Sequence, residues 1–443
     1  MAGKREMRGD ETICVVGLGY VGLPTAIAFH AAGFRVIGVD VSEKIIAKLR
    51  GGSSHLVDSS AELQIPIDSD RWEVTSEFKD AVPDSDVVLI TVPTPVNPDN
   101  SPDLSYVEAA SESVISNISP GRRTAVVLES TVYPGVTRKV LGGLCSKFGL
   151  SENEDLVIAY CPERVNPGDF ERGIESVAQI VGCDDKEWGG WLADLFAMIT
   201  DESSTYVGKI EVAEASKLIE NVQRDIDIAF ANELAMVLPR VGIDVEEVLA
   251  AASTKWNFHR HTPGIGVGGH CIPVDPYYYI ELSEKAGFPS SLATASRKIN
   301  NSMPINTADE ILVILENVDR PRVLVMGYSY KANVGDTRET PVSPMVNRLK
   351  DSGCEIIIQD PLVNTEELPD WVEKFVNPSE CKSIDLVVLA TPHQEFEYAN
   401  NILWGSIKEI MNKPRVYDGR RVLPRRKMES DGWEYHGVGN PIK

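Results

Sequence analysis

The sequence lacks the cysteine pattern of a disulfide framework or of a structural metal centre. Its 443 residues include seven cysteines, which are odd in number and widely spaced and contain no CxxC pair. Such usage argues against paired disulfides and against a structural zinc site, and it is typical of a reducing compartment. We therefore expect a cytoplasmic protein that binds no metal.

Positive charge is scarce as well. Lys and Arg number 43 against 66 Asp and Glu, which gives a net charge of −23. Because nucleic acid demands a basic face, we expect no nucleic-acid partner. An acidic protein can still hold a phosphorylated ligand in a locally basic pocket. The overall charge fits either a salty cytoplasm or simple solubility.

Long hydrophobic runs are missing, with one apparent exception. Residues 12–34 carry no Asp, Glu, Lys or Arg and follow three basic residues, as a signal peptide or a membrane span would. Several glycines and Pro24 make this stretch a poor hydrocarbon span. A strand, a turn and a helix explain it better, so we expect no membrane association.

The same stretch carries a dinucleotide-binding pattern. A β-rich run over 12–16 leads into Gly17-x-Gly19-x-x-Gly22, an Ala-rich helical pattern over 24–32 and a second β run over 36–40 that ends in Asp40. The glycines permit a tight turn and a close pyrophosphate, and the helix N-terminus supplies N–H groups. Asp40 would accept from the ribose hydroxyls and repel a 2′-phosphate, so the motif predicts NAD. The predicted contacts are Gly17, Gly19, Tyr20, Val21, Gly22 and Asp40.

Three further β runs, over 86–92, 125–130 and 156–160, each end in a polar or proline-containing loop. In an open α/β sheet, ligands sit at the carboxyl ends of the strands. Thr94, Thr131 and Glu163 are therefore candidate site residues, although each alone would also fit a loop cap.

A long helical pattern follows over 211–238. Lys217, Asn221, Arg224 and Asp225 fall on one face of it, which fits either a solvated stripe or a buried stripe facing a site. Apolar contacts are expected from Val212, Leu218, Ile219, Val222, Ile226, Phe230, Val237 and Leu238. The helix is long enough to form an interface, so we expect a homodimer or a larger homo-oligomer.

The β pattern restarts at 322–327, 354–360 and 386–391 and predicts a second parallel α/β domain. This part lacks GxGxxG, so it is not expected to bind a second dinucleotide. It carries Lys331 and Asp336-Thr337-Arg338 in the loop after its first strand, where a phosphate would be held. The predicted fold is α/β, with two Rossmann-like parallel-sheet domains joined by a long central helix and a helical dimerisation region.

Residues 264–278 set Cys271 among glycines, with Asp275 four residues on and tyrosines after it. Glycines let the atoms of another molecule approach the backbone closely, so Cys271 is a candidate nucleophile. The alternative is a turn with an inert buried cysteine.

These motifs, in this order, resemble the UDP-glucose/GDP-mannose dehydrogenase family over nearly the whole chain. The resemblance rests on GLGYVGLP, the loop 92–95, Ser130 to Val132, Pro162-Glu163, Lys217 with Asn221, GGHCIPVDPYY, and Lys331 with residues 336–338. It implies three parts. These are an NAD-binding domain (1–200), a central helical dimerisation domain (201–305) and a C-terminal domain that binds a UDP-sugar (306–443).

The resemblance also implies a reaction, the four-electron oxidation of a sugar C6 hydroxyl with two NAD. Cys271 matches the nucleophile, and Lys217 and Asn221 match the pair that stabilises the oxyanion. Asp275 and Thr131 match groups that handle the proton and the water, and Glu163 matches a carboxylate of the hydrolytic step. Thr94, Thr131 and Arg338 are further expected cofactor contacts. Expected substrate contacts are Glu163, Arg164, Val165, Lys217, Asn221, Arg260, His261, Gly268 and Lys331.

One departure bears on the substrate. Pro167 stands where UDP-glucose members carry a further acidic residue. Together with ERVNPG at 163–168 and the segment 255–258, it looks more like members that oxidise UDP-N-acetylhexosamines. UDP-N-acetyl-D-mannosamine is the first expectation, and UDP-N-acetylglucosamine, UDP-N-acetylgalactosamine and UDP-glucose are the alternatives. A two-electron hydroxyacid dehydrogenase and an inactive nucleotide-sugar-binding protein are more remote ones.

Overall fold

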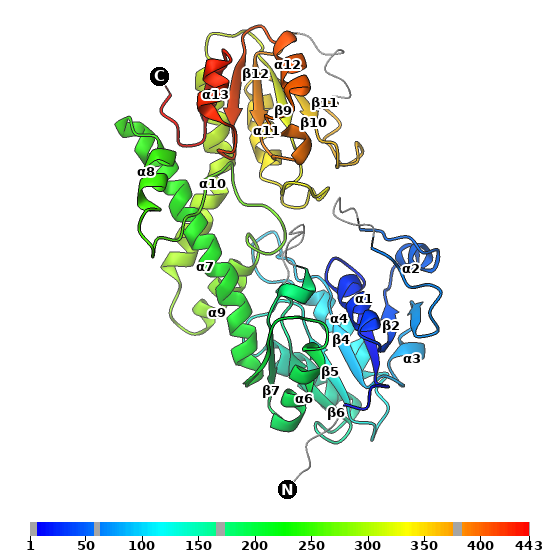
Figure 1. The fold of residues 1–443 in the computed structure, drawn as a ribbon. Helices are drawn as coiled ribbons and strands as arrows, with labels where there is room; N and C mark the ends of the chain where they lie inside the picture. The colour runs from blue at the N-terminus through cyan, green and yellow to red at the C-terminus, as the bar shows by residue number, and fades with distance from the viewer. Residues whose placement is uncertain (1–6, 57–62, 165–172, 375–382, 443) are drawn as a thin grey trace. The chain divides into compact units, whose positions relative to one another are not determined.

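The computed structural model describes residues 7–56, 63–164, 173–374 and 383–442. The chain divides into two compact units (Figure 1). The first comprises residues 1–56, 60–221 and 277–289, and the second consists mainly of residues 222–276 and 290–443. Helices α7 (Ile210–Val237) and α9 (Asp275–Lys285) each have residues in both units. The three-part division expected from the sequence stays a prediction.

The first unit is built on an eight-stranded sheet with the order β3-β2-β1-β4-β5-β6-β7-β8. Its strands pair in parallel, except that β6 runs antiparallel to β7. The order reverses between β1 and β4, and in such sheets this switch marks the ligand crevice. The strands are β1 (Thr12–Val16), β2 (Arg35–Val39), β3 (Trp72–Thr75), β4 (Val87–Ile90), β5 (Thr124–Leu128), β6 (Leu156–Tyr160), β7 (Gln179–Cys183) and β8 (Ser204–Gly208).

Helices cover both faces of this sheet. Successive residues of β1 alternate between two hydrophobic cores, with Ile13 and Val15 in one and Cys14 and Val16 in the other. Burial on both faces explains the nearly continuous hydrophobic strands. The helical elements are α1 (Gly22–Ala31), α2 (Glu43–Arg50), α3 (Phe78–Ala81), α4 (Ser105–Ile115), η1 (Arg138–Gly142), α5 (Gly143–Phe148), η2 (Ile174–Ser176) and α6 (Lys186–Phe196).

The second unit carries a six-stranded parallel sheet with the order β11-β10-β9-β12-β13-β14. Residues of β9 alternate between two cores in the same way, Val323 and Val325 against Leu324 and Met326. Its strands are β9 (Arg322–Met326), β10 (Glu355–Gln359), β11 (Glu373–Lys374), β12 (Leu386–Leu389), β13 (Arg415–Asp418) and β14 (Glu434–Gly437). Its helical elements are η3 (Leu238–Val241), α8 (Val245–Ala252), α10 (Ser291–Ile314), α11 (Val342–Asp351), η5 (Gln394–Phe396), α12 (Asn401–Glu409) and α13 (Arg425–Ser430).

The predicted α/β class, with two Rossmann-like parallel-sheet domains and a long central helix, is confirmed. Individual strands are shorter than predicted. The strand expected over 86–92 is β4, which ends at Ile90, and Thr91 after it donates its N–H to the Val16 carbonyl oxygen at 2.9 Å and its hydroxyl to the Gly17 carbonyl oxygen at 2.7 Å.

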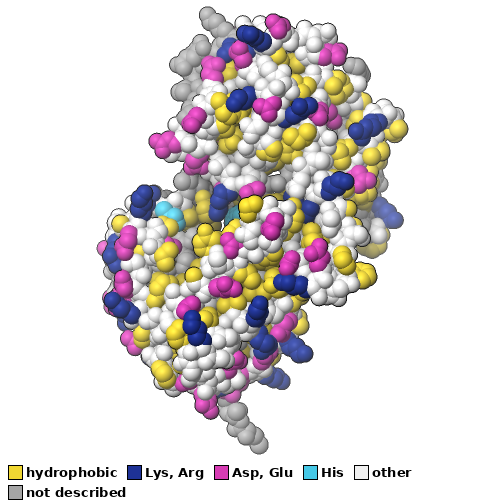
Figure 2. Space-filling view, turned by 180° about the vertical axis from the view of Figure 1, so that it is seen from behind, with side chains coloured by type: hydrophobic (Ala, Val, Ile, Leu, Met, Phe, Trp, Pro, Cys, Tyr) yellow, Lys and Arg dark blue, Asp and Glu magenta, His cyan; other side chains and the backbone are white. Residues whose placement is uncertain are grey.

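The described surface mixes charges of both signs. On the face shown in Figure 2, Lys and Arg side chains are interspersed with Asp and Glu over the described residues. Within the described part of the chain, no helix has the length and apolarity needed to cross a bilayer.

Candidate active site

Two glycines of the turn between β1 and α1 are needed by the turn itself. Gly17 has a φ of +92° and donates its N–H to the Val39 carbonyl oxygen at 2.8 Å. A Cβ on Gly17 would lie 2.9 Å from the Thr91 carbonyl oxygen, and a Cβ on Gly22 would overlap the Gly17 carbonyl oxygen. These two positions therefore accept no side chain, whether or not a ligand is bound.

Gly19 is different, because a Cβ built on it meets nothing within 4 Å. The open space lies at the N-terminus of α1, where Tyr20 and Val21 complete the turn. Asp40 at the end of β2 accepts from the backbone N–H of Leu18 at 2.9 Å and of Ser42 at 2.8 Å. An open glycine, a helix N-terminus and a fixed carboxylate fit the pyrophosphate and ribose of NAD.

The segment after β5 is tied to helix α7. Ser130 donates its hydroxyl to the Val92 carbonyl oxygen at 2.7 Å. Beyond Thr131, the backbone N–H groups of Gly135 and Thr137 donate to the Glu214 carboxylate of α7 at 2.6 and 2.9 Å. The first unit thus brings the Thr131 segment against the helix that carries Lys217 and Asn221.

Only three of the four residues on the predicted polar face of α7 are buried together. Lys217, Asn221 and Asp225 are buried, whereas Arg224 is exposed and does not belong with them. Several of the predicted apolar contacts are also exposed, namely Val212, Ile219, Phe230 and Val237. The buried polar stripe of the prediction is therefore limited to Lys217, Asn221 and Asp225.

Helix α9 is hydrogen-bonded to the loop that contains Thr94. The Tyr278 hydroxyl donates to the Pro95 carbonyl oxygen at 3.1 Å, and the Lys285 ammonium donates to the Tyr133 hydroxyl at 2.9 Å. Thr94 itself is partly buried. These bonds fix the loops after β4 and β5 against the same helix.

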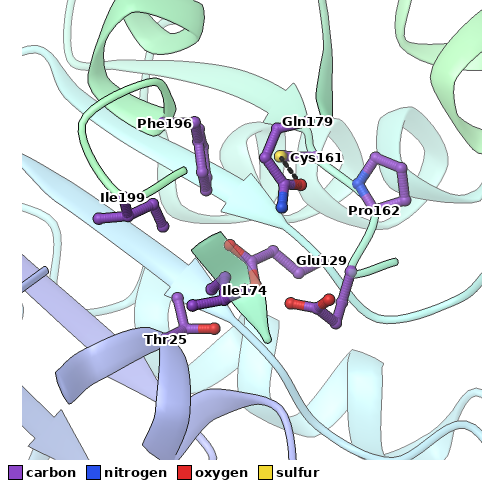
Figure 3. A pocket seen from close by; sticks show the side chains of 9 residues that line it. Thr25, Glu129, Cys161, Pro162, Ile174, Gln179, Phe196 and Ile199 are labelled. Carbon is purple, nitrogen blue, oxygen red and sulfur yellow. Dashed lines mark hydrogen bonds between the residues drawn. The ribbon is translucent and has the colours of Figure 1, made fainter. Parts of the chain in front are cut away.

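A narrow pocket lies beside β5 and β6, lined among others by Glu129, Cys161, Glu163 and Gln179 (Figure 3). The Cys161 thiol donates to the Gln179 side-chain oxygen at 4.0 Å. Burial, followed by the charges of Glu129 and Glu163, raises the pKa of Cys161 well above its usual range. Cys161 is thus a buried thiol, not a thiolate.

Arg164, which follows Glu163, is committed to neighbours within the first unit. Its guanidinium makes a two-point ion pair with Glu220 of α7, at 2.6 and 3.2 Å, and donates to the Ala178 carbonyl oxygen at 2.7 Å. Arg164 therefore holds the chain after β6 against α7. Val165 and Pro167 lie outside the described residues.

In the second unit, the glycines before Cys271 are filled by the chain itself. A Cβ on Gly268 would lie 2.7 Å from the Glu339 carbonyl oxygen and 2.7 Å from Tyr330, and a Cβ on Gly269 would lie 2.7 Å from the Tyr330 ring. The interpretation that these glycines leave room for another molecule is wrong at those Cα atoms. They make room for the loop 328–341. Gly268 as a substrate contact stays a prediction.

The segment that leads to Cys271 is also hydrogen-bonded to α7. The Gly264 N–H donates to the Asn232 side-chain oxygen of α7 at 3.0 Å. Asn232 in turn donates to Asn300 of α10 at 2.9 Å, and Asn300 donates to the Asp225 carboxylate at 2.8 Å. A buried chain of amides therefore anchors the loop that leads to the cysteine.

Cys271 stands apart from the other described cysteines. Cys14, Cys145, Cys161, Cys183 and Cys354 are all buried, whereas Cys271 is partly exposed. Burial raises the pKa of Cys14 to about 12 and that of Cys145 to about 11. The Cys271 carbonyl oxygen accepts from the N–H of the buried Asp275 at 2.8 Å, which places the cysteine one turn before α9. Among the described thiols, it is the one suited to act as a nucleophile.

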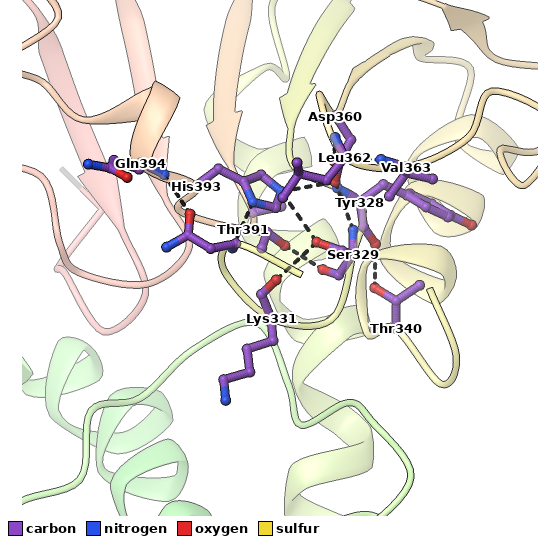
Figure 4. A network of polar contacts seen from close by, with 12 residues as sticks. Tyr328, Ser329, Lys331, Thr340, Asp360, Leu362, Val363, Thr391, His393 and Gln394 are labelled. Carbon is purple, nitrogen blue, oxygen red and sulfur yellow. Dashed lines mark hydrogen bonds and ion pairs between the residues drawn. The ribbon is translucent and has the colours of Figure 1, made fainter. Parts of the chain in front are cut away.

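The loop that carries Lys331 is fixed by a buried polar network (Figure 4). The Asn333 N–H donates to His393 Nδ1 at 2.9 Å, so the proton of this ring belongs on Nε2, which faces Asp360 at 3.1 Å. The Ser329 hydroxyl donates to the Lys331 carbonyl oxygen at 3.1 Å. Because the ring offers Ser329 no basic nitrogen, Ser329, His393 and Asp360 do not form a nucleophilic triad. These three residues instead hold the Lys331 loop in place.

The other predicted basic residues of this unit are engaged within it. Arg338 pairs with Asp336 at 2.6 Å, and Arg260 pairs with Glu246 of α8 at 2.5 Å. His261 Nδ1 is buried without a hydrogen-bond partner among the described residues. The contacts expected of Arg338 with the cofactor and of Arg260, His261 and Lys331 with the substrate stay predictions.

The predicted catalytic residues fall into two groups. Thr131, Glu163, Lys217 and Asn221 belong to the first unit, and Cys271 and Asp275 belong to the second. Their action at one site stays a prediction. Sequence reasoning missed Glu129 and Glu214, although both are charges within otherwise apolar patterns. No group of three His, Cys, Asp or Glu residues suited to a metal occurs in the described ranges.

Comparison with known proteins agrees with this arrangement. Three models of the UDP-glucose/GDP-mannose dehydrogenase family match in order, the NAD binding domain over 11–200, the central domain over 211–302 and the UDP binding domain over 324–425. UDP-N-acetyl-D-glucosamine 6-dehydrogenase of Pseudomonas aeruginosa is 37% identical over 95% of this chain and 99% of its own length. UDP-N-acetyl-D-mannosamine dehydrogenase of Pyrococcus horikoshii is 34% identical over 96% of this chain and 99% of its own.

Solved structures extend the likeness to three dimensions. The Pyrococcus horikoshii UDP-D-ManNAc dehydrogenase superposes with a TM-score of 0.85, covering 97% of this chain and 99% of that one at 32% identity. A UDP-glucose dehydrogenase from Pyrobaculum islandicum gives the same TM-score of 0.85 at 28% identity, covering 98% of this chain and 100% of that one. The chain therefore belongs to the UDP-glucose/GDP-mannose dehydrogenase family and is an NAD-dependent UDP-sugar dehydrogenase.

Proposed function

We propose that the protein oxidises the C6 hydroxyl of a UDP-N-acetylhexosamine to the carboxylate, with UDP-N-acetyl-D-mannosamine as the first substrate to test. The observation that carries this proposal is the full-length similarity to enzymes named for UDP-N-acetylglucosamine and UDP-N-acetylmannosamine. UDP-N-acetylglucosamine is the second candidate, because a relative named for it is 37% identical. UDP-N-acetylgalactosamine and UDP-glucose remain as further alternatives.

In the first oxidation the chain binds and orients the sugar. NAD, when bound, supplies the acceptor for the hydride that each of the two oxidations removes. The alcohol proton passes to water, and Asp275 and Thr131 are the groups proposed to handle that proton and water. Lys217 and Asn221 direct an ammonium and an amide N–H toward the sugar oxygen, where negative charge develops.

The second oxidation requires a tetrahedral carbon that still bears hydrogen. The Cys271 thiolate attacks the aldehyde carbon, a C–S bond forms, and the resulting oxyanion is held by Lys217 and Asn221. This thiohemiacetal restores the C–H bond that a second hydride loss needs, and it also prevents escape of the aldehyde. Loss of that hydride leaves a thioester on Cys271.

Hydrolysis then returns the enzyme to its starting state. Glu163 takes a proton from water, the water oxygen bonds to the thioester carbon, and the C–S bond breaks with its electron pair on sulfur. The second proton of that water leaves the product carboxyl group, and both protons pass to solvent, so that Glu163 is ionised again. A carboxylate base near neutral pH is suited to this step. The products are the uronate and the free Cys271 thiolate.

Stoichiometry tests the reaction. Purified protein is incubated with each of the four UDP-sugars while NADH and sugar product are measured together. Two NADH per sugar are expected, with the highest kcat/KM for an N-acetylhexosamine. One NADH per sugar would identify a two-electron dehydrogenase instead. Cys271→Ser is expected to form no uronate, and full uronate output from this variant would exclude the covalent route.

The expected homodimer is proposed to use an exposed apolar stripe on α7. Val212, Ile219, Phe230 and Val237 are 46, 55, 57 and 49% exposed and recur at spacings of 7 and 11 residues. At 100° per residue, these spacings place all four on one side of the helix. Phe230→Asp is expected to shift the mass of the native protein from dimer to monomer in analytical ultracentrifugation. Retention of the dimer would place the interface elsewhere.

A further inference from the structure

A carboxyl group that the mechanism leaves unused lies deep in the first unit. Glu129, directly after β5, is 4% exposed, and its side chain points into the pocket beside β6 (Figure 3). Ile174, Phe196 and Ile199 form an apolar part of the pocket lining. Glu129 Oε1 is buried and has no hydrogen-bond partner among the described residues. An ionised carboxylate would be costly in such surroundings.

Among the described residues, the groups that line the pocket around Glu129 offer it no compensating positive charge. Cys161 and Glu163 line the same pocket from the segment that follows β6, Thr25 comes from α1, and Gln179 comes from β7. Arg164 lies close to Cys161, but its guanidinium is bound to Glu220 and to the Ala178 carbonyl oxygen. Burial, followed by the charge of Glu163, raises the pKa of Glu129 well above its usual range.

A second buried glutamate in the same unit shows what a structural carboxylate looks like here. Glu214 is also fully buried, but it accepts two backbone N–H bonds at 2.6 and 2.9 Å. Glu129 Oε1 has no such donors. A role as an internal hydrogen-bond acceptor therefore explains Glu214 and does not explain Glu129.

We propose that Glu129 is a positioning residue that keeps a proton at neutral pH, so that the negative charge of this pocket stays on Glu163. The inference rests on the proposed function, in which Glu163 is the base for thioester hydrolysis. Two like charges in one poorly solvated pocket cannot both form easily, and the more buried carboxyl keeps the proton. Glu163 takes the proton from water and later releases it to solvent, while Glu129 holds its own proton throughout.

Glu129→Gln tests this, because glutamine copies the shape of a neutral carboxylic acid. In the native wild-type protein Glu129 keeps a proton that the unfolded chain releases above about pH 4.5. Wild-type stability therefore falls as pH rises through this range, relative to a variant that cannot titrate there. The thermal midpoint of Glu129→Gln is expected to exceed that of the wild type by a margin that widens from pH 5 to pH 8. The matched control, Glu214→Gln, is expected to lose stability at every pH.

Two further measurements separate the proposal from a merely structural role. The difference infrared spectrum of wild type minus Glu129→Gln at pH 7 is expected to show one protonated carboxyl band. The acid limb of the kcat profile is expected at the same pH in both proteins, because neither carries a charge at position 129. A shift of that limb downward by about one pH unit in Glu129→Gln would show that an ionised Glu129 had been raising the pKa of Glu163, and would overturn the proposal.

The outcomes also distinguish this inference from the proposed function. A constant difference in thermal midpoint across pH, or no carboxyl band, would overturn the role of Glu129 even in an enzyme that oxidises UDP-sugars. Absence of UDP-sugar oxidation by the wild type would overturn the proposed function, while the infrared and unfolding measurements would still report the proton on Glu129.

Discussion

The Glu214 carboxylate of α7 accepts the backbone N–H of Thr137 at 2.9 Å. Together with the bond from Gly135, this joins the helix that bears Lys217 to the loop that follows Thr131. Two segments that are far apart in the chain are thereby held in register by one buried side chain, which is fully enclosed.

Replacing that carboxylate gives the first prediction. Glu214→Gln substitutes an amide NH₂ for one of the two acceptor oxygens, so at least one buried N–H loses its partner. The expected loss is about 1–3 kcal/mol of unfolding free energy. Urea denaturation measures it, and Glu211→Gln, at a partly exposed position of α7, is the matched control. Equal urea midpoints for Glu214→Gln and wild type would show that the two hydrogen bonds to Glu214 do not stabilise the fold.

Lys217 is expected to act on the transition state and not on the fold. Lys217→Ala removes the cation proposed to hold the oxyanion, and kcat is expected to fall about 100- to 1000-fold. Steady-state NADH formation measures the effect. Lys209→Ala, at an exposed position just before α7, should retain wild-type kcat. A loss of less than tenfold in Lys217→Ala would assign the oxyanion to other groups.

Two substitutions in the turn between β1 and α1 separate an effect on NAD binding from an effect on packing. Gly22→Ala puts a methyl group onto the Gly17 carbonyl oxygen, so it is expected to destabilise the first unit. Gly19→Ala meets nothing within 4 Å and should fold normally, while its methyl group obstructs the pyrophosphate. Calorimetric NAD titration is expected to show at least tenfold weaker binding for Gly19→Ala, with an unchanged thermal midpoint. Unchanged NAD affinity would move the pyrophosphate away from Gly19.

Asp360 makes the stability of the second unit depend on pH. Burial alone would raise its pKa, but the hydrogen bond with His393 and those from the N–H groups of Ser329 and Tyr328 outweigh burial and lower it. Because the folded pKa is depressed, the stabilisation is present above about pH 4 and is lost as pH falls through the folded value.

Asp360→Asn tests this sign. The variant is expected to be about 1–3 kcal/mol less stable than the wild type at pH 7, with a gap that closes below about pH 4. Urea denaturation across that pH range measures the gap. A gap that stays constant with pH would mean that Asp360 acts through shape alone.

Periodicity and motif spacing were sufficient to predict both sheets, the NAD turn and the long helix. The β1–α1–β2 unit is local, so its glycines and Asp40 could be read directly. Strand β7 was not predicted, because it pairs antiparallel with β6 and its place depends on tertiary contacts. Strands β13 and β14 were also missed, because each has only four residues, RVYD and EYHG, and the charged and polar residues among them hide the β pattern.

Within the site, residue types were predictable and their neighbours were not. Cys271 stood out from its surroundings in the sequence. The glycines before it were misread, because the atoms that fill the space above them come from Tyr330, Glu339 and Pro341, about 60 to 75 positions later in the chain. Glu129 was missed because its significance lies in what surrounds it, and an isolated charge after a β run carries no such information.

The fit of the loop 328–341 against Gly266, Gly268 and Gly269 has a consequence for anyone building chimaeras in this family. The loop that contains Gly266 to Cys271 and the loop 328–341 after β9 pack closely against each other, even though a long stretch of chain separates them. A graft of either loop alone from a relative would set mismatched side chains against bare backbone. Exchanging both together is the smallest transplant that preserves their fit.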